Sequence, residues 1–177
     1  MPGAGQVREP RLFAVGTEIA AQVAVRRLKE RRETFATAES LTGGLVAATV
    51  VEIEGVSKVY LGGVVVYATE MKHVLAGVPE RLLAERGAVD SEVATALAEG
   101  VRERCGATWG VATTGVAGPE PQDGKPVGLV YVAVAGPSGA QVRELRLDGD
   151  RAAIRTESVT RALLLLADCL KDAPAVV

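Results

Sequence analysis

The sequence predicts an α/β protein, folded as a three-layer α/β/α sandwich around a mixed sheet of about five strands. Helix-like and strand-like segments alternate through most of the 177 residues. Hydrophobic residues make up 48% of the chain but aromatic residues only 3%. We therefore expect a core of Val, Ala and Leu, whose small side chains let the helices lie close to the sheet. A chain of this length is expected to bury one core.

The predicted boundaries follow from turn residues and hydrophobic periodicity. Residues 1–16 mix Pro, Gly and charge and are expected to form a flexible N-terminal arm, and residues 17–177 a single domain. Thr17 is the predicted N-cap of the first helix. The predicted helices are 17–32, 43–53, 69–77, 79–87, 91–106 and 150–170, and the predicted strands are 34–38, 61–68, 108–114, 127–136 and 140–147.

Two strands carry more specific predictions. The β-branched run at 61–68 is typical of a central strand. The turn "PSG" at 137–139 predicts a hairpin, so the last two strands should be antiparallel neighbours.

Charge and cysteine content narrow the classes of function. The net charge is -2, and no Lys/Arg cluster is interleaved with aromatic residues, so nucleic acid is a poor candidate partner. Cys105 and Cys169 lie in helix-like segments and are expected to be buried free thiols. The chain shows no apolar signal region and no apolar run near the roughly 18 residues that span a bilayer. We therefore expect a cytoplasmic protein that does not associate with a membrane.

Polar segments, two of them glycine-bearing, lie at the ends of the first three predicted strands: "ESLTGG", "YATEMK" and "TTGVAGPEPQDGKPVG". Ligands of open α/β sheets bind at the carboxyl ends of strands, so these segments are expected to form a site. A fourth segment, "LDGDRAAIR", places Arg151 at the start of the last helix, where it could reach a phosphate. No HExxH, paired CxxC or compact Asp cluster is present, so we expect neither a metal nor another cofactor.

Ser40 in "ESLTGG" is either a nucleophile or part of a helix cap. Gly43 and Gly44 would leave main-chain N–H groups unshielded at a helix start, which suits a phosphate or a developing oxyanion. Alternatively, Ser40 or Thr42 is the N-cap, and the glycines permit close packing of the helix on the sheet. This segment alone favours neither interpretation.

A serine nucleophile needs a base, and Lys72 is the better candidate. His73 is the only histidine, and a lone histidine is more often structural. Burial would lower the pKa of Lys72 and free its lone pair, although an exposed lysine is the simpler interpretation of this residue alone. Tyr67 could orient the lysine or be a sheet-edge aromatic. Thr114 and Gly115 could form part of an anion or ribose clamp, or of a plain connection between strands.

Six stretches taken together resemble the C-terminal domain family of the competence-damage-inducible protein CinA. They are "TAESLTGG", "GGVVVYATEMKHVLAGVP", "GAVDSEVATALAEGVRER", "TTGVAGPE", "KPVGLVYVAV" and "GDRAAIR", between about residue 17 and about residue 171. The resemblance implies an α/β/α fold and hydrolysis of the carboxamide of nicotinamide mononucleotide to nicotinate mononucleotide and ammonia, in pyridine-nucleotide salvage. It implies a homo-oligomer and no metal. Larger relatives carry an additional N-terminal domain.

By matching positions, the resemblance implies that Ser40 is the nucleophile, Lys72 its base and Tyr67 an assisting residue. The substrate-binding residues are then Glu39, Thr42, Gly43, Gly44, Thr114, Gly115 and Arg151. We expect amides near Gly43 and Gly44 to stabilise the oxyanion.

The sequence also departs from the family. Members commonly have Cys where Leu41 stands and Ser-Asn where Ala68 and Thr69 stand, and the loop at 119–124 has less glycine. Two alternatives therefore remain: a non-catalytic nucleotide-binding or regulatory module, and a hydrolase for a different amide.

Overall fold

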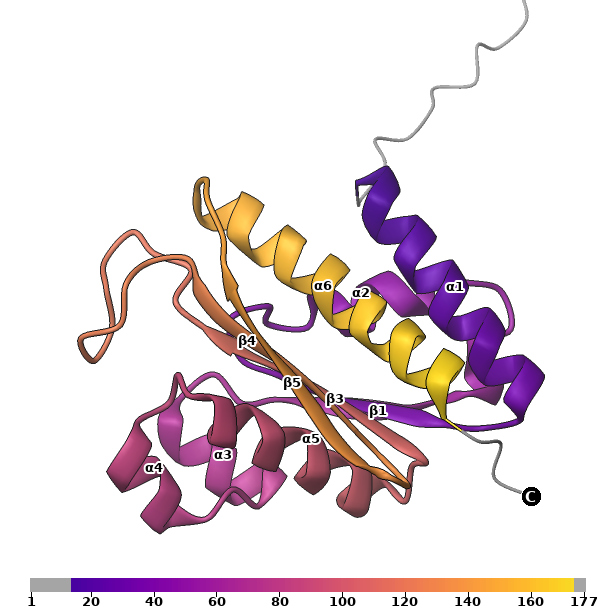
Figure 1. Ribbon diagram of the computed structural model, residues 1–177, viewed down its shortest axis with the longest axis horizontal. Coiled ribbons are helices and arrows are strands. Elements are labelled where there is room, and N and C mark those ends of the chain that lie inside the picture. Colours follow the sequence, from indigo (N-terminus) through magenta and orange to yellow (C-terminus); the bar gives the residue numbers. More distant parts are fainter. Residues whose placement is uncertain (1–13, 174–177) are drawn as a thin grey trace, which may run out of the picture.

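The computed structural model describes residues 14–173, which form the predicted three-layer sandwich (Figure 1). Its five-stranded mixed sheet has the strand order β2-β1-β3-β4-β5. The strands are β1 (Phe35–Glu39), β2 (Tyr60–Val65), β3 (Trp109–Gly115), β4 (Leu129–Gly136) and β5 (Gly139–Arg146). The helices are α1 (Val15–Arg31), α2 (Leu45–Val51), the 3₁₀ turn η1 (Val56–Lys58), α3 (Thr69–Ala76), α4 (Glu80–Arg86), α5 (Ser91–Cys105) and α6 (Arg151–Asp172).

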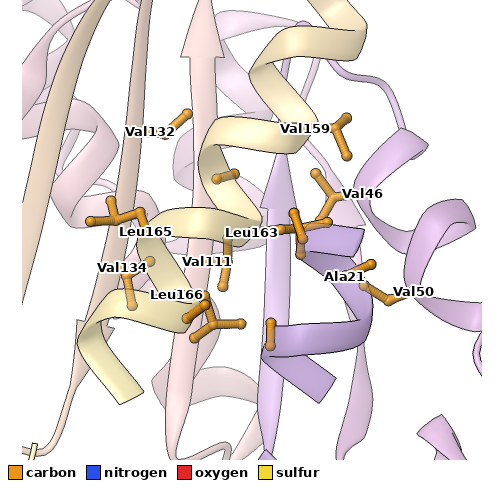
Figure 2. Close-up of a cluster of buried hydrophobic side chains, with 14 of the residues drawn as sticks. Ala21, Val46, Val50, Val111, Val132, Val134, Val159, Leu163, Leu165 and Leu166 are labelled. Atoms are coloured by element: carbon orange, nitrogen blue, oxygen red, sulfur yellow. The ribbon is translucent and has the colours of Figure 1, made fainter. Parts of the chain in front are cut away.

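Each face of the sheet has its own hydrophobic core. Helices α1, α2 and α6 cover one face, and α3, α4 and α5 cover the other (Figure 1). Figure 2 shows the first core, where Leu163 and Leu166 of α6 lie over Val111 and Val134 of the sheet. The second core has more alanine, which allows α5 to approach the strands closely.

Two glycines lie where main-chain segments around the second core approach each other closely. A Cβ atom on Gly100 of α5 would lie 1.7 Å from the carbonyl oxygen of Ala76 at the end of α3. On Gly110 of β3 it would lie 1.9 Å from the carbonyl oxygen of Ala98. Helix α5 therefore lies so close to α3 and to β3 that only glycine fits at these two positions.

The first helix differs from the prediction at its start. It begins at Val15, two residues early, and Ala14 is its N-cap, so Thr17 is not the cap. Thr17 is buried inside α1, and its Oγ1 lies 2.7 Å from Oγ1 of Thr160 on α6. The hydroxyl that was predicted to cap the helix thus joins two helices. Most of the predicted N-terminal arm, residues 1–13, lies outside the described residues.

The predicted central position of the strand at 61–68 is wrong. β2 is the outermost strand, beside β1, and its side chains alternate in exposure, with Leu61 and Val65 exposed. β-branched residues favour extended backbone at an edge as well as at the centre, so composition predicts a strand but not its neighbours. The hairpin at 137–139 is confirmed, because β4 and β5 pair antiparallel.

The two cysteines of the described segment are free thiols. Cys169 is buried, and burial raises the pKa of its thiol to about 11. Cys105 is only half-buried, contrary to the prediction. Between residues 14 and 173 no helix combines the length and the apolar composition that crossing a membrane requires.

The sheet topology brings the polar segments together. β1 pairs parallel with both β2 and β3, so the carboxyl ends of all three strands lie at one edge. The segments after these strands therefore start from the same edge, as the sequence predicts.

We predict that Gly100→Ala destabilises the fold by about 1–3 kcal/mol, because the new methyl group meets a main-chain oxygen that cannot rotate away. Gly16→Ala is the matched control, since Gly16 also lies in a helix and has nothing within 4 Å of a built Cβ. That variant should be neutral or stabilising by up to about 1 kcal/mol. Urea unfolding of both variants measures the difference, and equal midpoints would contradict the close contact.

Candidate active site

Ser40 and Lys72 meet at the wall of a pocket of about 290 Å³ at this edge of the sheet. Lys72 Nζ donates hydrogen bonds to Ser40 Oγ at 3.0 Å and to the carbonyl oxygen of Val66 at 2.9 Å. Ser40 directly follows β1, and Lys72 lies in the first turn of α3. The parallel pairing of β1 with β2 thus joins two residues that are 32 positions apart.

Lys72 is almost completely buried, with a relative exposure of 1% for the whole residue. Burial lowers the pKa of Lys72 to about 8, against a weaker opposing effect of the Glu70 carboxylate. Among the described residues no carboxylate lies within ion-pair distance of Nζ. At pH 7 roughly a tenth of such an amine is neutral, which makes Lys72 chemically suited to accept a proton from Ser40.

Tyr67 and Arg151 lie together at the exposed rim of the pocket. Arg151 Nη2 donates to the Tyr67 hydroxyl at 2.8 Å, and Nη1 donates to the Gly118 carbonyl oxygen at 2.6 Å. Arg151 starts α6, whose N-cap Asp150 accepts a hydrogen bond from Ala153 N. The hydrogen bonds of Lys72 go to Ser40 and Val66, so the Val66 carbonyl, and not Tyr67, orients the lysine.

Thr114 and Gly115 both line the pocket, at the end of β3. The Thr114 hydroxyl is fully buried and donates to the Ala88 carbonyl oxygen at 2.6 Å. It therefore holds the segment between α4 and α5 against the pocket and is not turned toward a ligand. A Cβ on Gly115 would lie 2.8 Å from the Leu129 carbonyl oxygen, so a side chain there would press on β4.

Four residues of the predicted binding set do not line the pocket: Glu39, Thr42, Gly43 and Gly44. The Glu39 carboxylate is buried and caps helix α2 from within the chain. It accepts hydrogen bonds from the N–H groups of Gly44, Val46 and Ala47 at 2.8–3.0 Å, and from the Thr42 hydroxyl at 2.7 Å. The helix start that the sequence predicts as an anion site is thus filled by the protein's own anion.

This capping corrects the expected oxyanion site. The Gly43 N–H donates to the Ser40 carbonyl oxygen at 3.0 Å, and the Gly44 N–H donates to Glu39, so both amides are engaged. Ser40 is not a helix cap either, because Gly44 occupies the N-cap position and Ser40 Oγ bonds to Lys72. Thr42 is fully buried, and its hydroxyl lies 2.8 Å from that of Thr113.

Sequence reasoning missed several residues that shape the site. Arg155 lies one turn after Arg151 on α6 and donates to the carbonyl oxygens of Leu41 and Thr42, at 2.9 and 3.1 Å. It fixes the turn after Ser40. The signal available in the sequence was its position four residues after Arg151, which places both side chains on the same face of α6. The residues that line the pocket outside the predicted set include Ala88, Val89, Glu120 and Gln122. They come from loops, which carry no periodic signal.

Neither His73 nor a metal cluster is part of the site in the described residues. His73 Nδ1 lies 2.9 Å from the Val78 carbonyl oxygen, and His73 does not line the pocket. Within residues 14–173, no three His, Cys, Asp or Glu side chains are grouped so that they could hold a metal ion.

Comparison with known sequences identifies the family. The family model described as CinA C-terminal domain matches residues 17–170. A CinA-like protein of Frankia casuarinae is 52% identical over 147 residues, which are 83% of this chain and 34% of that protein. A CinA-like protein of Myxococcus xanthus is 41% identical over 174 residues, which are 96% of this chain and 41% of that protein. The chain thus spans 34–41% of the length of these two relatives.

Solved structures agree with this match. The competence/damage inducible protein CihA from Agrobacterium tumefaciens has a TM-score of 0.87 and 36% identity, covering 92% of this chain and 100% of its own. The competence damage-inducible protein A from Klebsiella pneumoniae has a TM-score of 0.86 and 29% identity, covering 89% of this chain and 99% of its own. Sequence, fold and the matched range coincide, and the chain belongs to the CinA C-terminal domain family.

Proposed function

We propose that this domain hydrolyses the carboxamide of nicotinamide mononucleotide to nicotinate mononucleotide and ammonia, with Ser40 as nucleophile and Lys72 as base. The observation that carries the proposal is the 3.0 Å contact between a buried amine and a hydroxyl at a pocket wall. A serine next to a desolvated lysine is an arrangement suited to acyl transfer. The substrate comes from the family resemblance.

The reaction proceeds in two stages through an acyl-enzyme. Neutral Lys72 Nζ takes the proton of Ser40 as Oγ attacks the carboxamide carbon, and the carbonyl electron pair moves to oxygen. When the tetrahedral intermediate collapses, the C–N bond breaks and Lys72 returns the proton to the leaving nitrogen as ammonia. Water then attacks the ester with Lys72 again as base, which frees the carboxylate product and restores the Ser40 hydroxyl.

The pocket offers matching groups for the rest of the substrate. Its buried wall includes Ser40 and Lys72, and its exposed rim holds Arg151, whose planar guanidinium suits a phosphate. Arg151 donates to Gly118 and Tyr67 across the mouth. A 5′-phosphate at the rim would place the pyridine amide toward the serine.

One observation keeps a different amide substrate under consideration. Ala68 and Thr69, where the family commonly has Ser-Asn, both line the pocket, so this departure changes its wall. Leu41 also lines the pocket, but its side chain packs in the first hydrophobic core, so the change at this position alters the pocket wall less. Any difference in substrate preference is therefore expected to come from positions 68 and 69.

We predict that Ser40→Ala and Lys72→Met each reduce ammonia release from nicotinamide mononucleotide by at least about 10³-fold, because each removes one half of the proton transfer. Ammonia release is measured by a coupled assay. Lys58→Ala changes an exposed lysine in η1 and should keep full turnover.

Three results would separate the alternatives. Near-full turnover in either site variant would contradict its assigned role. Wild-type binding of the mononucleotide by calorimetry without ammonia release would indicate a non-catalytic module. Faster turnover of another pyridine amide, in a panel with and without the 5′-phosphate, would indicate a different substrate.

We predict that Lys72→Met also stabilises the fold at pH 7. A pKa lowered from 10.5 to about 8 means that the ammonium form disfavours folding by about 3 kcal/mol. Loss of the hydrogen bonds to Val66 and Ser40 offsets about 1–2 kcal/mol of the gain, leaving about 1–2 kcal/mol. Thermal unfolding measures the difference in stability between the variant and the wild type. This difference should shrink as the pH rises from 8 to 10.5, because the wild-type lysine then loses its proton in the unfolded state as well. A variant less stable than wild type at pH 7 would contradict the lowered pKa.

The pH dependence of turnover follows from the same pKa. Because Lys72 must be neutral to act as the base, kcat/KM should rise about tenfold per pH unit below about 8 and level off above it. Initial rates between pH 6 and 9.5 measure the profile. A profile that is flat across pH 7 to 9 would exclude Lys72 as the base.

A further inference from the structure

We propose that the main-chain N–H of Leu41 is the hydrogen-bond donor that stabilises the oxyanion. This inference rests on the proposed role of Ser40 as nucleophile, and it replaces the amides of Gly43 and Gly44, which are engaged within the chain. Three observations support the inference: Leu41 lines the pocket, hydrogen bonds fix the orientation of its peptide, and its N–H has no acceptor among the described residues.

Leu41 contributes to the pocket and to the hydrophobic core at the same time. It lines the pocket beside Ser40, yet its side chain is only 4% exposed and packs in the core under α6. Since the side chain is committed to the core, the main chain of Leu41 is the part that faces the pocket.

The peptide between Ser40 and Leu41 has a fixed direction. This bond is trans, so its C=O and N–H point in opposite directions. The Ser40 carbonyl oxygen accepts from the Gly43 N–H and points into the turn that precedes α2. The Leu41 N–H therefore points away from that turn. The Leu41 carbonyl oxygen accepts from Arg155 Nε, which holds the next peptide in place.

The Leu41 N–H has no acceptor among the described residues. Nearby N–H groups are engaged: that of Ser40 donates to the Thr113 carbonyl oxygen, and that of Gly44 donates to Glu39. The Thr42 N–H also has no acceptor among the described residues, but Thr42 is fully buried and does not line the pocket. A main-chain donor in a buried turn normally has a partner, because an unmade bond costs about 1–3 kcal/mol. An open donor on the pocket side is explained by an acceptor that arrives with the substrate.

The position also suits the chemistry. The N–H of the residue after a nucleophile lies close to the carbon that the nucleophile attacks, so it can reach the oxygen that becomes negative. The Glu39 cap and Arg155 hold the turn on both sides, and the donor needs no reorganisation during the reaction.

Replacement of the Leu41 amide by an ester tests the inference. Nonsense suppression with α-hydroxyisocaproic acid keeps the leucine side chain in the full chain and removes the N–H. It also weakens the Ser40 carbonyl oxygen as an acceptor for the Gly43 N–H, so urea unfolding of the ester variant checks that the turn is kept. We expect kcat for nicotinamide mononucleotide to fall about 10²–10³-fold with little change in KM. The matched control is an ester at Ser138, in the exposed β4–β5 turn, which should keep wild-type kcat.

A second measurement needs no variant. Pyridine-3-carboxaldehyde should form a hemiacetal with Ser40 of the wild-type protein, and a crystal structure of this adduct should place its oxygen about 2.7–3.1 Å from Leu41 N. An adduct oxygen beyond hydrogen-bond distance of Leu41 N, or an ester variant with near-wild-type kcat, overturns the inference and leaves the proposed function standing. If the wild type releases no ammonia, the proposed function fails and this inference fails with it.

Discussion

Removal of the Lys72 amine from water is the constraint on which the site depends. Among residues 14–173, the ammonium form has only a serine hydroxyl and one main-chain carbonyl as partners, and burial lowers its pKa toward neutrality. The two cores on either side of the sheet must supply the stability that this arrangement loses. A lysine held in this way weakens the fold and is reactive for the same reason.

Glu39 is the opposite case, a buried charge whose hydrogen bonds are made by the chain itself. Three amides and one hydroxyl surround its carboxylate, and they belong to the turn and helix directly after Ser40. A fully bonded carboxylate is rigid and unreactive. The two adjacent residues therefore have different tasks, since Glu39 fixes the turn and Ser40 is left to contact the lysine.

The sequence predicts the layers and the shared edge well, because alternation of helix and strand leaves few topologies. It could not predict that β2 is an edge strand, since β-branched residues favour any strand. The sequence also could not predict that Glu39 caps α2. A carboxylate before a glycine-rich turn fits a ligand contact or an internal cap, and only the backbone path decides between them. Thr17 is similar, because a hydroxyl near a helix start fits a cap or a contact with α6.

The pocket divides into a fixed interior and an adaptable rim. Ser40, Lys72 and the Leu41 main chain are held by buried hydrogen bonds or by core packing. The rim residues Tyr67 and Arg151 are exposed, as are Glu120 and Gln122 of the loop after β3. Changes at exposed loop positions cost little stability, whereas changes in the interior disturb packed or bonded atoms. Under the proposed function, the interior would keep amide cleavage constant while the rim, together with Ala68 and Thr69, adjusts which amide is bound.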